Sequence, residues 1–277
     1  MSRRDFLKAA ALGLAGLGVG RTDAVRQPFV KPFKFLVFTD IHYLPGDWTN
    51  DTPEFLEKVL ARAERENCQM VIQLGDMIHG VCKPSKRVID DYLKIYNDFK
   101  VPSYHVMGNH DTDVLTKDEF FAHVSNTGFA AAQGYYSFVR GGVKFIVLDA
   151  NFNSDSDSDH FSRGNWTWSV AYIPPAERAW LEAELAAATC PVVVFCHQRL
   201  DGTGSYFVKN AAEVRRIIEK SRKVIGVFAG HEHSGGRNCM NGVSYYTLRS
   251  LAESGQSFEV ACYPNGISVF GHGINGG

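Results

Sequence analysis

The stretch KFLVFTDIH, residues 34–42, places a run of apolar residues directly before a carboxylate and an imidazole. Short apolar runs rich in β-branched and aromatic residues are typical of strands that are buried on both faces. The stretch therefore predicts a buried strand with Asp40 and His42 at its carboxyl end.

Four further segments repeat this arrangement. Largely apolar runs at residues 70–74, 104–107, 192–195 and 224–229 each lead into a short polar segment. These polar segments are Gly75-Asp76, Gly108-Asn109-His110-Asp111, His197 and Gly230-His231-Glu232-His233. Between the apolar runs lie helical patterns, one of them opening at Thr52-Pro53 with Phe55, Leu56, Val59, Leu60 and Ala63 on one face. Alternating strands and helices indicate α/β architecture, in which ligands collect beyond the carboxyl ends of the strands, so we expect all five polar segments to meet at one edge.

The residue types at these strand ends point to metal ions. Carboxylate and amide oxygens and imidazole nitrogens suit manganese, iron or zinc, and no cysteine is among the candidates, which argues against a closed structural zinc site. Seven candidates are too many for one open catalytic ion and suit two ions that share Asp76. Two ions about 3.5–4 Å apart can activate a bridging water and clamp a phosphoryl oxygen. The candidate ligands are Asp40, His42, Asp76, Asn109, His197, His231 and His233.

The ordered series D-x-H, G-D, G-N-H-D, H and G-H-x-H resembles the motifs of the calcineurin-like metallophosphoesterase superfamily, over roughly residues 33 to 265. The resemblance implies an α/β (α+β) fold, a four-layer αββα sandwich of two mixed β-sheets flanked by helices, in a domain at residues 33–271. It implies that one ion is held by Asp40, His42 and His233, that the other is held by Asn109, His197 and His231, and that Asp76 bridges them. It also implies that His110 faces the phosphoryl group as a catalytic residue without binding metal.

A closer resemblance bears on the substrate. Residues 135–138, 145–149, 164–166, 230–236 and 246–248 resemble the manganese-dependent ADP-ribose/CDP-alcohol diphosphatases. Aromatic residues near the predicted site could stack on a base or sugar, or could simply fill gaps in packing. Arginines there could grip a phosphate, or could form salt bridges with neighbouring acids. The candidate substrate-binding residues are Trp166, Tyr206, Arg199 and Arg249, with Trp168 and Tyr245 as further aromatic candidates.

Other polar residues have structural interpretations. The remaining histidines, His79, His105, His123, His160 and His272, lack convergent partners in the sequence and are expected to be structural. The tract at residues 154–159 alternates aspartates like a calcium loop, but it lacks the glycine and the glutamate of such loops. We therefore expect a solvated acidic loop.

The N-terminus predicts export. Residues 2–8, SRRDFLK, carry a twin-arginine signature, and residues 9–20 form an apolar run of the length of a signal sequence rather than a membrane span. An amphipathic N-terminal helix is the alternative, but the run has no polar face. We expect a twin-arginine signal segment at residues 1–26 and a periplasmic or other extracytoplasmic location. The cleavage site is left open, and with it whether the segment stays as an uncleaved membrane anchor.

Composition limits the partners. The formal net charge of −1 offers no basic field for nucleic acid, so the expected partner is a small phosphorylated substrate, and the oligomeric state is left open. The six cysteines contain no C-x-x-C pair, and buried thiols are expected at Cys190 and Cys196. The turns at Asn241-Gly242 and Pro264-Asn265-Gly266 predict two hairpins, which we expect to form the second sheet.

These features together predict an exported dinuclear-metal phosphoesterase, an enzyme that hydrolyses a phosphate ester or pyrophosphate bond by attack of a metal-bridging hydroxide. The ions would be manganese, iron or zinc. Monoester, diester and pyrophosphate substrates share such a metal core, so the choice among them stays open. A non-catalytic protein that binds a phosphorylated ligand on the same fold is the alternative, and a metal-dependent hydrolase of another bond is a second one.

Overall fold

The strand that precedes Asp40 and His42 lies in the middle of a five-stranded sheet in the computed structural model. Three neighbouring strands of this sheet are parallel, and two antiparallel strands extend it on the other side. The order is β11 (Gly266–Gly273), β10 (Gln256–Tyr263), β1 (Phe33–Phe38), β2 (Val71–Gln73) and β3 (Ser103–His105).

A second, six-stranded sheet is also mixed. Its four inner strands run parallel, and an antiparallel strand closes each edge. The order is β4 (Tyr136–Arg140), β5 (Val143–Leu148), β6 (Val192–Cys196), β7 (Val224–Ala229), β9 (Val243–Thr247) and β8 (Gly236–Met240).

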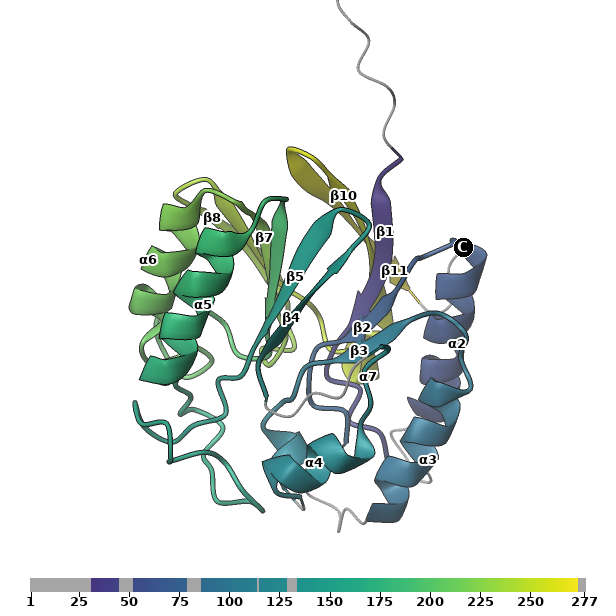
Figure 1. Cartoon of the computed structure of the whole chain (residues 1–277). Helices are drawn as coiled ribbons and strands as arrows, with labels where there is room; N and C mark the ends of the chain where they lie inside the picture. The colour runs from purple at the N-terminus through teal and green to yellow at the C-terminus, as the bar shows by residue number, and fades with distance from the viewer. Residues whose placement is uncertain (1–30, 45–51, 79–85, 114, 129–133, 274–277) are drawn as a thin grey trace, which may run out of the picture. The chain divides into compact units, whose positions relative to one another are not determined.

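Helices cover the outer face of each sheet. Figure 1 shows α2 (Thr52–Arg65) and α3 (Lys86–Asn97) beside the five-stranded sheet, and α5 (Pro175–Ala187) and α6 (Ala211–Ser221) beside the six-stranded sheet. The shorter helical segments are η1 (His110–Thr112), α4 (Lys117–His123) and α7 (Leu251–Ser254). The predicted four-layer αββα sandwich is therefore confirmed. The apolar face predicted on the first helix is also buried, except that Phe55 packs at the edge of the core.

The apolar run of β1 is continuous because both of its faces are buried. Phe33, Phe35 and Val37 pack between the two sheets, while Leu36 and Phe38 pack under α2 and α3. The Phe35 ring meets the rings of Phe145, Phe195 and Phe228 edge-on at 5.6, 5.8 and 6.2 Å, one of the preferred arrangements of aromatic pairs.

One hairpin lies in a different sheet from the one expected. The β8–β9 hairpin belongs to the six-stranded sheet, as predicted, but β10 and β11 join β1 in the five-stranded sheet, with Phe33 opposite Cys262. The prediction that both hairpins form the second sheet was wrong for β10–β11. A turn motif identifies a hairpin locally, whereas the free strand edge that the hairpin joins is set by distant pairing.

The structure describes residues 31–44, 52–78, 86–113, 115–128 and 134–273. Residues from Pro32 onward form one compact unit. The predicted signal segment at residues 1–26, His79 and Cys82 lie outside the described residues. Of the helices in the described ranges, none has the length and apolar character needed to cross a membrane.

Candidate metal centre

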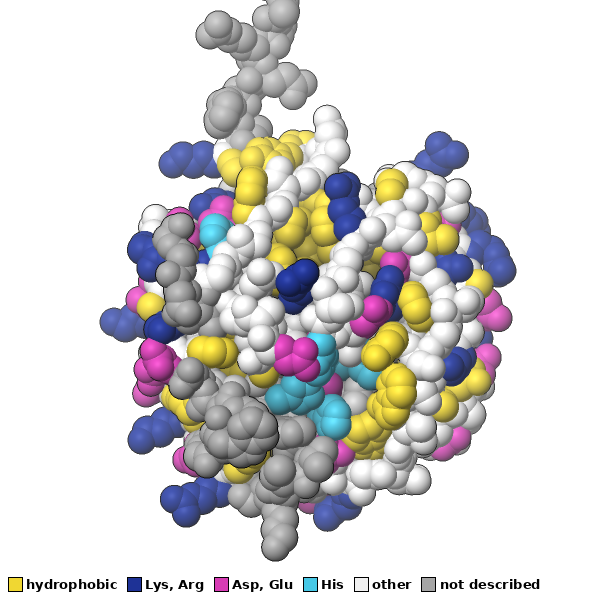
Figure 2. Space-filling view, turned by 180° about the vertical axis from the view of Figure 1, so that it is seen from behind, with side chains coloured by type: hydrophobic (Ala, Val, Ile, Leu, Met, Phe, Trp, Pro, Cys, Tyr) yellow, Lys and Arg dark blue, Asp and Glu magenta, His cyan; other side chains and the backbone are white. Residues whose placement is uncertain are grey.

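The seven candidate ligands come together at one edge of the sandwich. Each follows the carboxyl end of a parallel strand: β1, β2 and β3 in one sheet, and β6 and β7 in the other. Figure 2 shows histidine side chains gathered in a hollow on this face, with hydrophobic side chains along one rim. The two sheets thus bring together segments that lie almost 200 residues apart: Nε2 of His42 and Nε2 of His233 are 3.2 Å from each other.

The ligand atoms form overlapping clusters. Within each cluster the atoms lie within 4.8 Å of one another: Asp40 with His42 and His233, His42 with Asp76 and His110, and Asp76 with His197 and His231. Asp76 belongs to two of the three clusters. Such groups of carboxylates and histidines could hold two metal ions with Asp76 between them.

Buried polar atoms at the centre fit the binding of cations. Oδ1 of Asp40 and Oδ1 of Asn109 are buried, and no hydrogen-bond partner for either is found in the described ranges. An unpaired buried polar group costs about 1–3 kcal/mol, and more when it is charged. Both atoms are oxygen donors of the kind that hard or borderline cations accept, so the residues present fit a metal site.

The histidines are oriented by hydrogen bonds from their other ring nitrogen. Nδ1 of His197 donates to the carbonyl of Leu74 at 2.9 Å, and Nε2 of His231 donates to the carbonyl of Trp168 at 2.9 Å. Nδ1 of His233 donates to Glu253. Each bond leaves the other ring nitrogen, Nε2 in His197 and His233 and Nδ1 in His231, as the atom that could coordinate an ion once it carries no proton.

The charges at the centre favour a cation. Burial alone would raise the pKa of Asp76, but the nearby His197 and His110 hold that pKa well below its usual range. Burial lowers the pKa of His42 to about 4 and that of His231 to about 4, so both rings are neutral near pH 7. Burial would also lower the pKa of His197 and of His233, but Asp76 raises the pKa of His197 to about 9 and Asp40 raises that of His233 to about 9. The centre therefore combines ionised carboxylates with two neutral rings and two rings from which a bound cation would displace a proton.

Four of the candidate ligand residues have left-handed backbone conformations. The φ angles of Asp40, His42, Asp76 and His231 are 50°, 44°, 52° and 65°, and these are four of the eight non-glycine residues with positive φ in the described part of the chain. Such conformations cost on the order of 1–3 kcal/mol each and persist where surrounding contacts enforce them. The fold thus holds the loops that carry the candidate ligands in strained backbone conformations.

Glycines allow the ligand loops to approach one another. A Cβ atom on Gly75 would lie 2.4 Å from Nδ1 of His197, and one on Gly108 would lie 2.1 Å from the backbone nitrogen of Asp76. A Cβ on Gly230 would lie 2.0 Å from Oγ1 of Thr39, next to Asp40. The glycines of three motifs are therefore needed where one ligand loop packs on another.

His110 lies beside the ligands and is held in place from several sides. Its Nδ1 donates to Oδ2 of Asp113 at 2.9 Å, and its backbone N–H donates to Oδ1 of Asp76 at 2.9 Å. The ring packs edge-on against Trp166, with 5.0 Å between centroids. Burial would lower the pKa of His110, but the charge of Asp76 and the hydrogen bond to Asp113 raise it. The imidazole thus keeps a proton to higher pH than usual.

Two aspartates near His110 have roles that the sequence analysis did not assign. Asp113 partners His110, and its spacing of three residues within a helical turn was the available signal. Asp111 is fully buried, and its carboxylate accepts hydrogen bonds from the backbone N–H groups of Met77 and Gly108, both at 2.8 Å. Asp111 therefore joins the loop after β2 to the loop after β3.

Asn151 is a further residue that the sequence analysis missed. Its Nδ2 donates to the carbonyl of Met107 at 2.9 Å and to Oδ1 of Asp149 at 3.0 Å, while its Oδ1 accepts from Nε2 of Gln198 at 2.8 Å. Met107 precedes the segment of Asn109 and His110, and Gln198 follows His197. The fully buried Asn151 thus connects two ligand-bearing loops, and no local motif marks such a residue.

The pocket at the centre has a volume of about 420 Å³, and two aromatic side chains, Trp168 and Tyr206, lie at its rim. The Trp168 and Tyr206 rings lie 5.2 Å apart and are 47% and 40% exposed. Of the four candidate substrate-binding residues, only Tyr206 lines this pocket, while Trp166 packs beside it against His110. The lining residues are Asp76, Asn109, His110, Trp168, Tyr206, His231, Glu232, His233, Ser234 and Glu253.

The two candidate arginines lie elsewhere. Arg199 forms ion pairs with Asp201, 2.8 Å from its Oδ2, and with Glu232, which corresponds to the salt-bridge alternative rather than to phosphate binding. Arg199 therefore ties the loop after His197 to the loop of His231 and His233. Arg249 is exposed and lines a separate pocket with Gly235 and Phe258. The structure thus brings neither arginine into the lining of the metal pocket.

The other predicted features lie away from the centre. His105 is buried against the Tyr96 ring, and burial lowers its pKa to about 3. His123, His160 and His272 join none of the metal-ligand clusters found in the described residues. Asp155 in the acidic tract pairs with Arg178 at 2.6 Å, and Asp157 accepts from the N–H of Ala176. Cys196 is a buried free thiol, whereas Cys190 is only partly buried.

Comparisons with known proteins agree with this geometry. Residues 33–235 match the family model for calcineurin-like phosphoesterases. The chain is 27% identical over 296 residues to a manganese-dependent ADP-ribose/CDP-alcohol diphosphatase of Oryza sativa, covering 89% of this chain and 88% of that protein. It is 25% identical over 231 residues to a probable cyclic nucleotide phosphodiesterase of Rhodopseudomonas palustris, covering 79% and 78%. A solved dimetal phosphatase from Danio rerio shares the fold, with a TM-score of 0.73 at 18% identity, covering 89% of this chain and 98% of that one.

Proposed function

Because this chain belongs to the calcineurin-like phosphoesterase family, we propose that it hydrolyses a phosphate ester or pyrophosphate bond of a small nucleotide-like substrate at a two-metal centre. The observation that carries this proposal is the shared carboxylate. Asp76 belongs to two overlapping clusters of ligand atoms at the floor of a pocket that also contains His110.

In this proposal Asp40, His42 and His233 would hold one ion. Asn109, His197 and His231 would hold the other, and Asp76 would be shared between them. The hydrogen bonds to the outer nitrogens of His197, His231 and His233 support this division, because they turn the remaining ring nitrogens toward the clusters. Two bound ions would supply an activated water and positive charge for the phosphoryl oxygens.

His110 supplies the proton for the leaving group. Asp113 occupies Nδ1, so Nε2 is the nitrogen from which the protonated ring donates to the leaving oxygen. The charge of Asp76 and the hydrogen bond to Asp113 raise the pKa of His110 against the effect of burial, which favours the protonated ring, and Trp166 limits how the ring can turn. A positioned general acid of this kind contributes about 10²–10⁴-fold to turnover.

Trp168 and Tyr206 select the substrate by stacking. Exposed aromatic side chains at a polar site offer a planar group a surface that replaces water, worth about 1–3 kcal/mol per base. No lysine or arginine within the described ranges lines this pocket, so recognition beyond the centre rests on these rings. The rice relative is named for ADP-ribose and CDP-alcohols and the bacterial relative for cyclic nucleotides, while vertebrate relatives at 24–26% identity are named serine/threonine-protein phosphatases. The choice of a nucleotide therefore rests on the aromatic pair Trp168 and Tyr206 rather than on the names of the relatives.

A turnover panel tests the proposal. Manganese-loaded protein is assayed with a nitrophenyl monoester, a nitrophenyl diester, ADP-ribose and CDP-choline, and we expect preference for the last two. Trp168→Ala and Tyr206→Ala should each raise KM for ADP-ribose by about 5–160-fold with little change in kcat, which follows from the stacking energy. Tyr263→Ala, which removes an exposed aromatic residue of β10, is the matched control.

The possible outcomes separate the parts of the proposal. Unchanged KM in both pocket variants would remove the stacking role and leave the chemistry intact. Ligand binding with two ions present but without turnover of any substrate would favour the alternative, a non-catalytic phospho-ligand binding protein.

We also propose that the protein is exported by the twin-arginine route and works outside the cytoplasm. Arg3 and Arg4 followed by the apolar run at residues 9–20 support this proposal. Cell fractionation of the full-length chain tests it against the variant in which both arginines are changed to lysine. Equal extracytoplasmic amounts of the two proteins would contradict it.

A further inference from the structure

A second cavity lies at the end of the sandwich opposite the metal centre. Its volume is about 700 Å³, and it is lined by residues that precede β6 and β7, by the β8–β9 hairpin and by the turn between β10 and β11. Lys223 directly precedes β7, and His231 follows its other end. At about 3.3 Å per residue, the strand separates this cavity from the centre by roughly 25 Å.

The cavity has a cationic rim. Arg222, Lys223 and Arg237 line it, and no Asp or Glu is among the lining residues that the structure describes. Nζ of Lys223 donates to the carbonyls of Leu185 and Ala186 at the carboxyl end of α5, at 2.8 and 2.9 Å, and no ion pair between Lys223 and a carboxylate is found among the described residues. Arg222 and Arg237 are exposed and form no ion pair with any described residue. This local excess of positive charge is notable in a chain whose net charge is −1.

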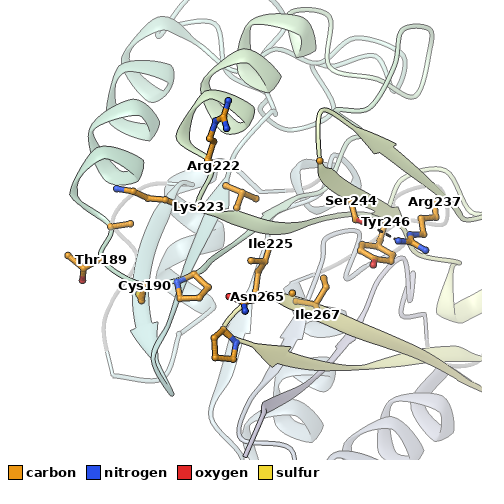
Figure 3. A pocket seen from close by; sticks show the side chains of 16 residues that line it. Thr189, Cys190, Arg222, Lys223, Ile225, Arg237, Ser244, Tyr246, Asn265 and Ile267 are labelled. Carbon is orange, nitrogen blue, oxygen red and sulfur yellow. Dashed lines mark hydrogen bonds between the residues drawn. The ribbon is translucent and has the colours of Figure 1, made fainter. Parts of the chain in front are cut away.

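Apolar and aromatic side chains form part of the floor between these cations, beside the polar Ser244 and Asn265. Figure 3 shows Arg222 and Lys223 on one side of the cavity, Arg237 and Tyr246 on the other, and Ile225 and Ile267 between them. The Tyr246 ring stacks on Phe228 at 5.0 Å, which fixes its plane. The guanidinium of Arg237 lies 5.3 Å from the centre of the Tyr246 ring, and its Nη2 donates to Oγ of Ser244 at 3.3 Å.

The backbone gives this floor its shape. A Cβ on Gly226 would lie 2.3 Å from Cδ1 of Ile267, so glycine at this position lets β7 and β11 approach closely at the base of the cavity. Arg222 ends α6 in the left-handed conformation, with φ of 55°, and this places Arg222 and Lys223 at the rim directly before β7 begins.

We propose that this cavity is a second binding site, separate from the metal centre, for a small organic anion such as a phosphorylated compound with a planar or apolar part. The arginines at the two sides pair with its charged groups, because guanidinium matches phosphate or sulfonate oxygens through paired hydrogen bonds. The planar part lies on Ile225 and Tyr246, where it displaces water from apolar surface. The site does not depend on the reaction catalysed at the metal centre.

Fluorescence titration with anilinonaphthalene sulfonate, an anion with planar rings, tests the site in the manganese-loaded protein. N-phenylnaphthylamine, which has the same rings without the sulfonate, is the neutral comparison ligand. In the double variant Arg222→Ala/Arg237→Ala we expect at least tenfold weaker binding of the sulfonate and unchanged binding of the neutral ligand. The double variant Arg65→Ala/Arg163→Ala removes equal charge from exposed arginines elsewhere and should bind both ligands like the wild type.

AMP competition distinguishes the cavity from the metal centre. We expect AMP to displace the sulfonate from the wild type and equally from Asp76→Asn, which loses the shared metal ligand and keeps the cavity. Equal sulfonate affinity in the wild type and in Arg222→Ala/Arg237→Ala would overturn the proposal, as would loss of AMP competition in Asp76→Asn. Because both arginines are exposed, the variant should unfold at the same temperature as the wild type, and this check keeps a negative result interpretable.

Discussion

Asp113 holds the His110 ring by a hydrogen bond of 2.9 Å from Nδ1 to the carboxylate Oδ2. The two residues lie three positions apart at η1, so a single helical turn sets their geometry. The carboxylate fixes one proton on Nδ1, so the second proton of the charged ring lies on Nε2. The carboxylate also stabilises the positive charge of the imidazolium. The proposed general acid and the carboxylate that positions it therefore lie within one turn of backbone, beside the candidate metal ligand Asn109.

Replacing His110 with alanine should lower kcat by about 10²–10⁴-fold, the usual contribution of a general acid. Both ions should remain bound, because the proposed ligand set does not include His110. Elemental analysis together with phosphate release measures the two effects. Full activity in this variant would eliminate the proposed role of His110.

Replacing Asp113 with alanine should lower kcat by about 10-fold, less than the loss of the ring itself, because His110 remains but its orientation and proton are less well held. Metal content should be unchanged. Asp118→Ala, which removes an exposed carboxylate of the nearby α4, is the control and should keep full activity. Equal kcat in Asp113→Ala and Asp118→Ala would contradict the assigned role.

Replacing Gly108 with alanine should remove metal binding while leaving the sandwich folded. The added Cβ would lie 2.2 Å from Oδ1 of Asp76, so the shared ligand must move. We expect the metal-to-protein ratio to fall by half or more. Gly236→Ala in β8, where the added Cβ meets nothing within 4 Å, serves as the control. An unchanged metal-to-protein ratio in the Gly108 variant would contradict this prediction, since the loops would then have moved apart without loss of metal.

Replacing Asn151 with alanine should lower the free energy of unfolding by about 2–4 kcal/mol, since it removes three buried hydrogen bonds of about 0.5–1.5 kcal/mol each. Turnover should fall as well, because the loops of Asn109 and His197 lose their link. Chemical denaturation and kinetics measure the two losses. Asn153→Ala, which affects only partly exposed contacts, should change both much less. A similar loss in both variants would contradict the linking role of Asn151.

The buried carboxyl group of Glu177 should make the free energy of unfolding depend on pH. Burial raises the pKa of this carboxyl well above its usual value, and the nearby Asp149 raises it further, while Lys117 lowers it. The folded state therefore binds this proton more tightly than the unfolded state does. Stability contributed by the neutral acid is present below the ordinary pKa of 4.5 and is lost as the pH rises toward the folded pKa, by about 1.4 kcal/mol per pH unit.

Glu177→Gln should remove this dependence. The Gln oxygen can still accept the hydrogen bond from the N–H of Asp149, which Glu177 accepts at 2.8 Å. Denaturation between pH 5 and 8 should therefore show the variant becoming more stable than the wild type as the pH rises. Parallel curves for the two proteins would mean that Glu177 is ionised in the fold.

The seven proposed ligands could be selected from the sequence because each signal is local. An apolar run predicts a buried strand, and the polar residue that follows lies at its carboxyl end, where parallel strands of both sheets meet. The same reasoning could not choose between Trp166 and Trp168, which are two residues apart in one loop. Trp166 packs against His110, and Trp168 faces Tyr206 across the pocket rim. The roles of the two tryptophans differ because of the path of the loop, which local sequence does not reveal.

The α/β architecture, the strand ends that carry the candidate ligands and the chemical class of the centre could be predicted from local sequence patterns, because periodicity and residue type act over a few neighbouring positions. The four-layer sandwich was predicted from the resemblance to a known family. Only the folded chain shows that Arg199 pairs with Asp201 and Glu232, that Asn151 links two loops with candidate ligands and that β10–β11 joins the sheet of β1. Local sequence patterns cannot predict these contacts, because most of the partners are far apart in the sequence. Hydrogen bonds and ion pairs require atoms within about 3–4 Å, and only the folded chain brings such distant segments that close.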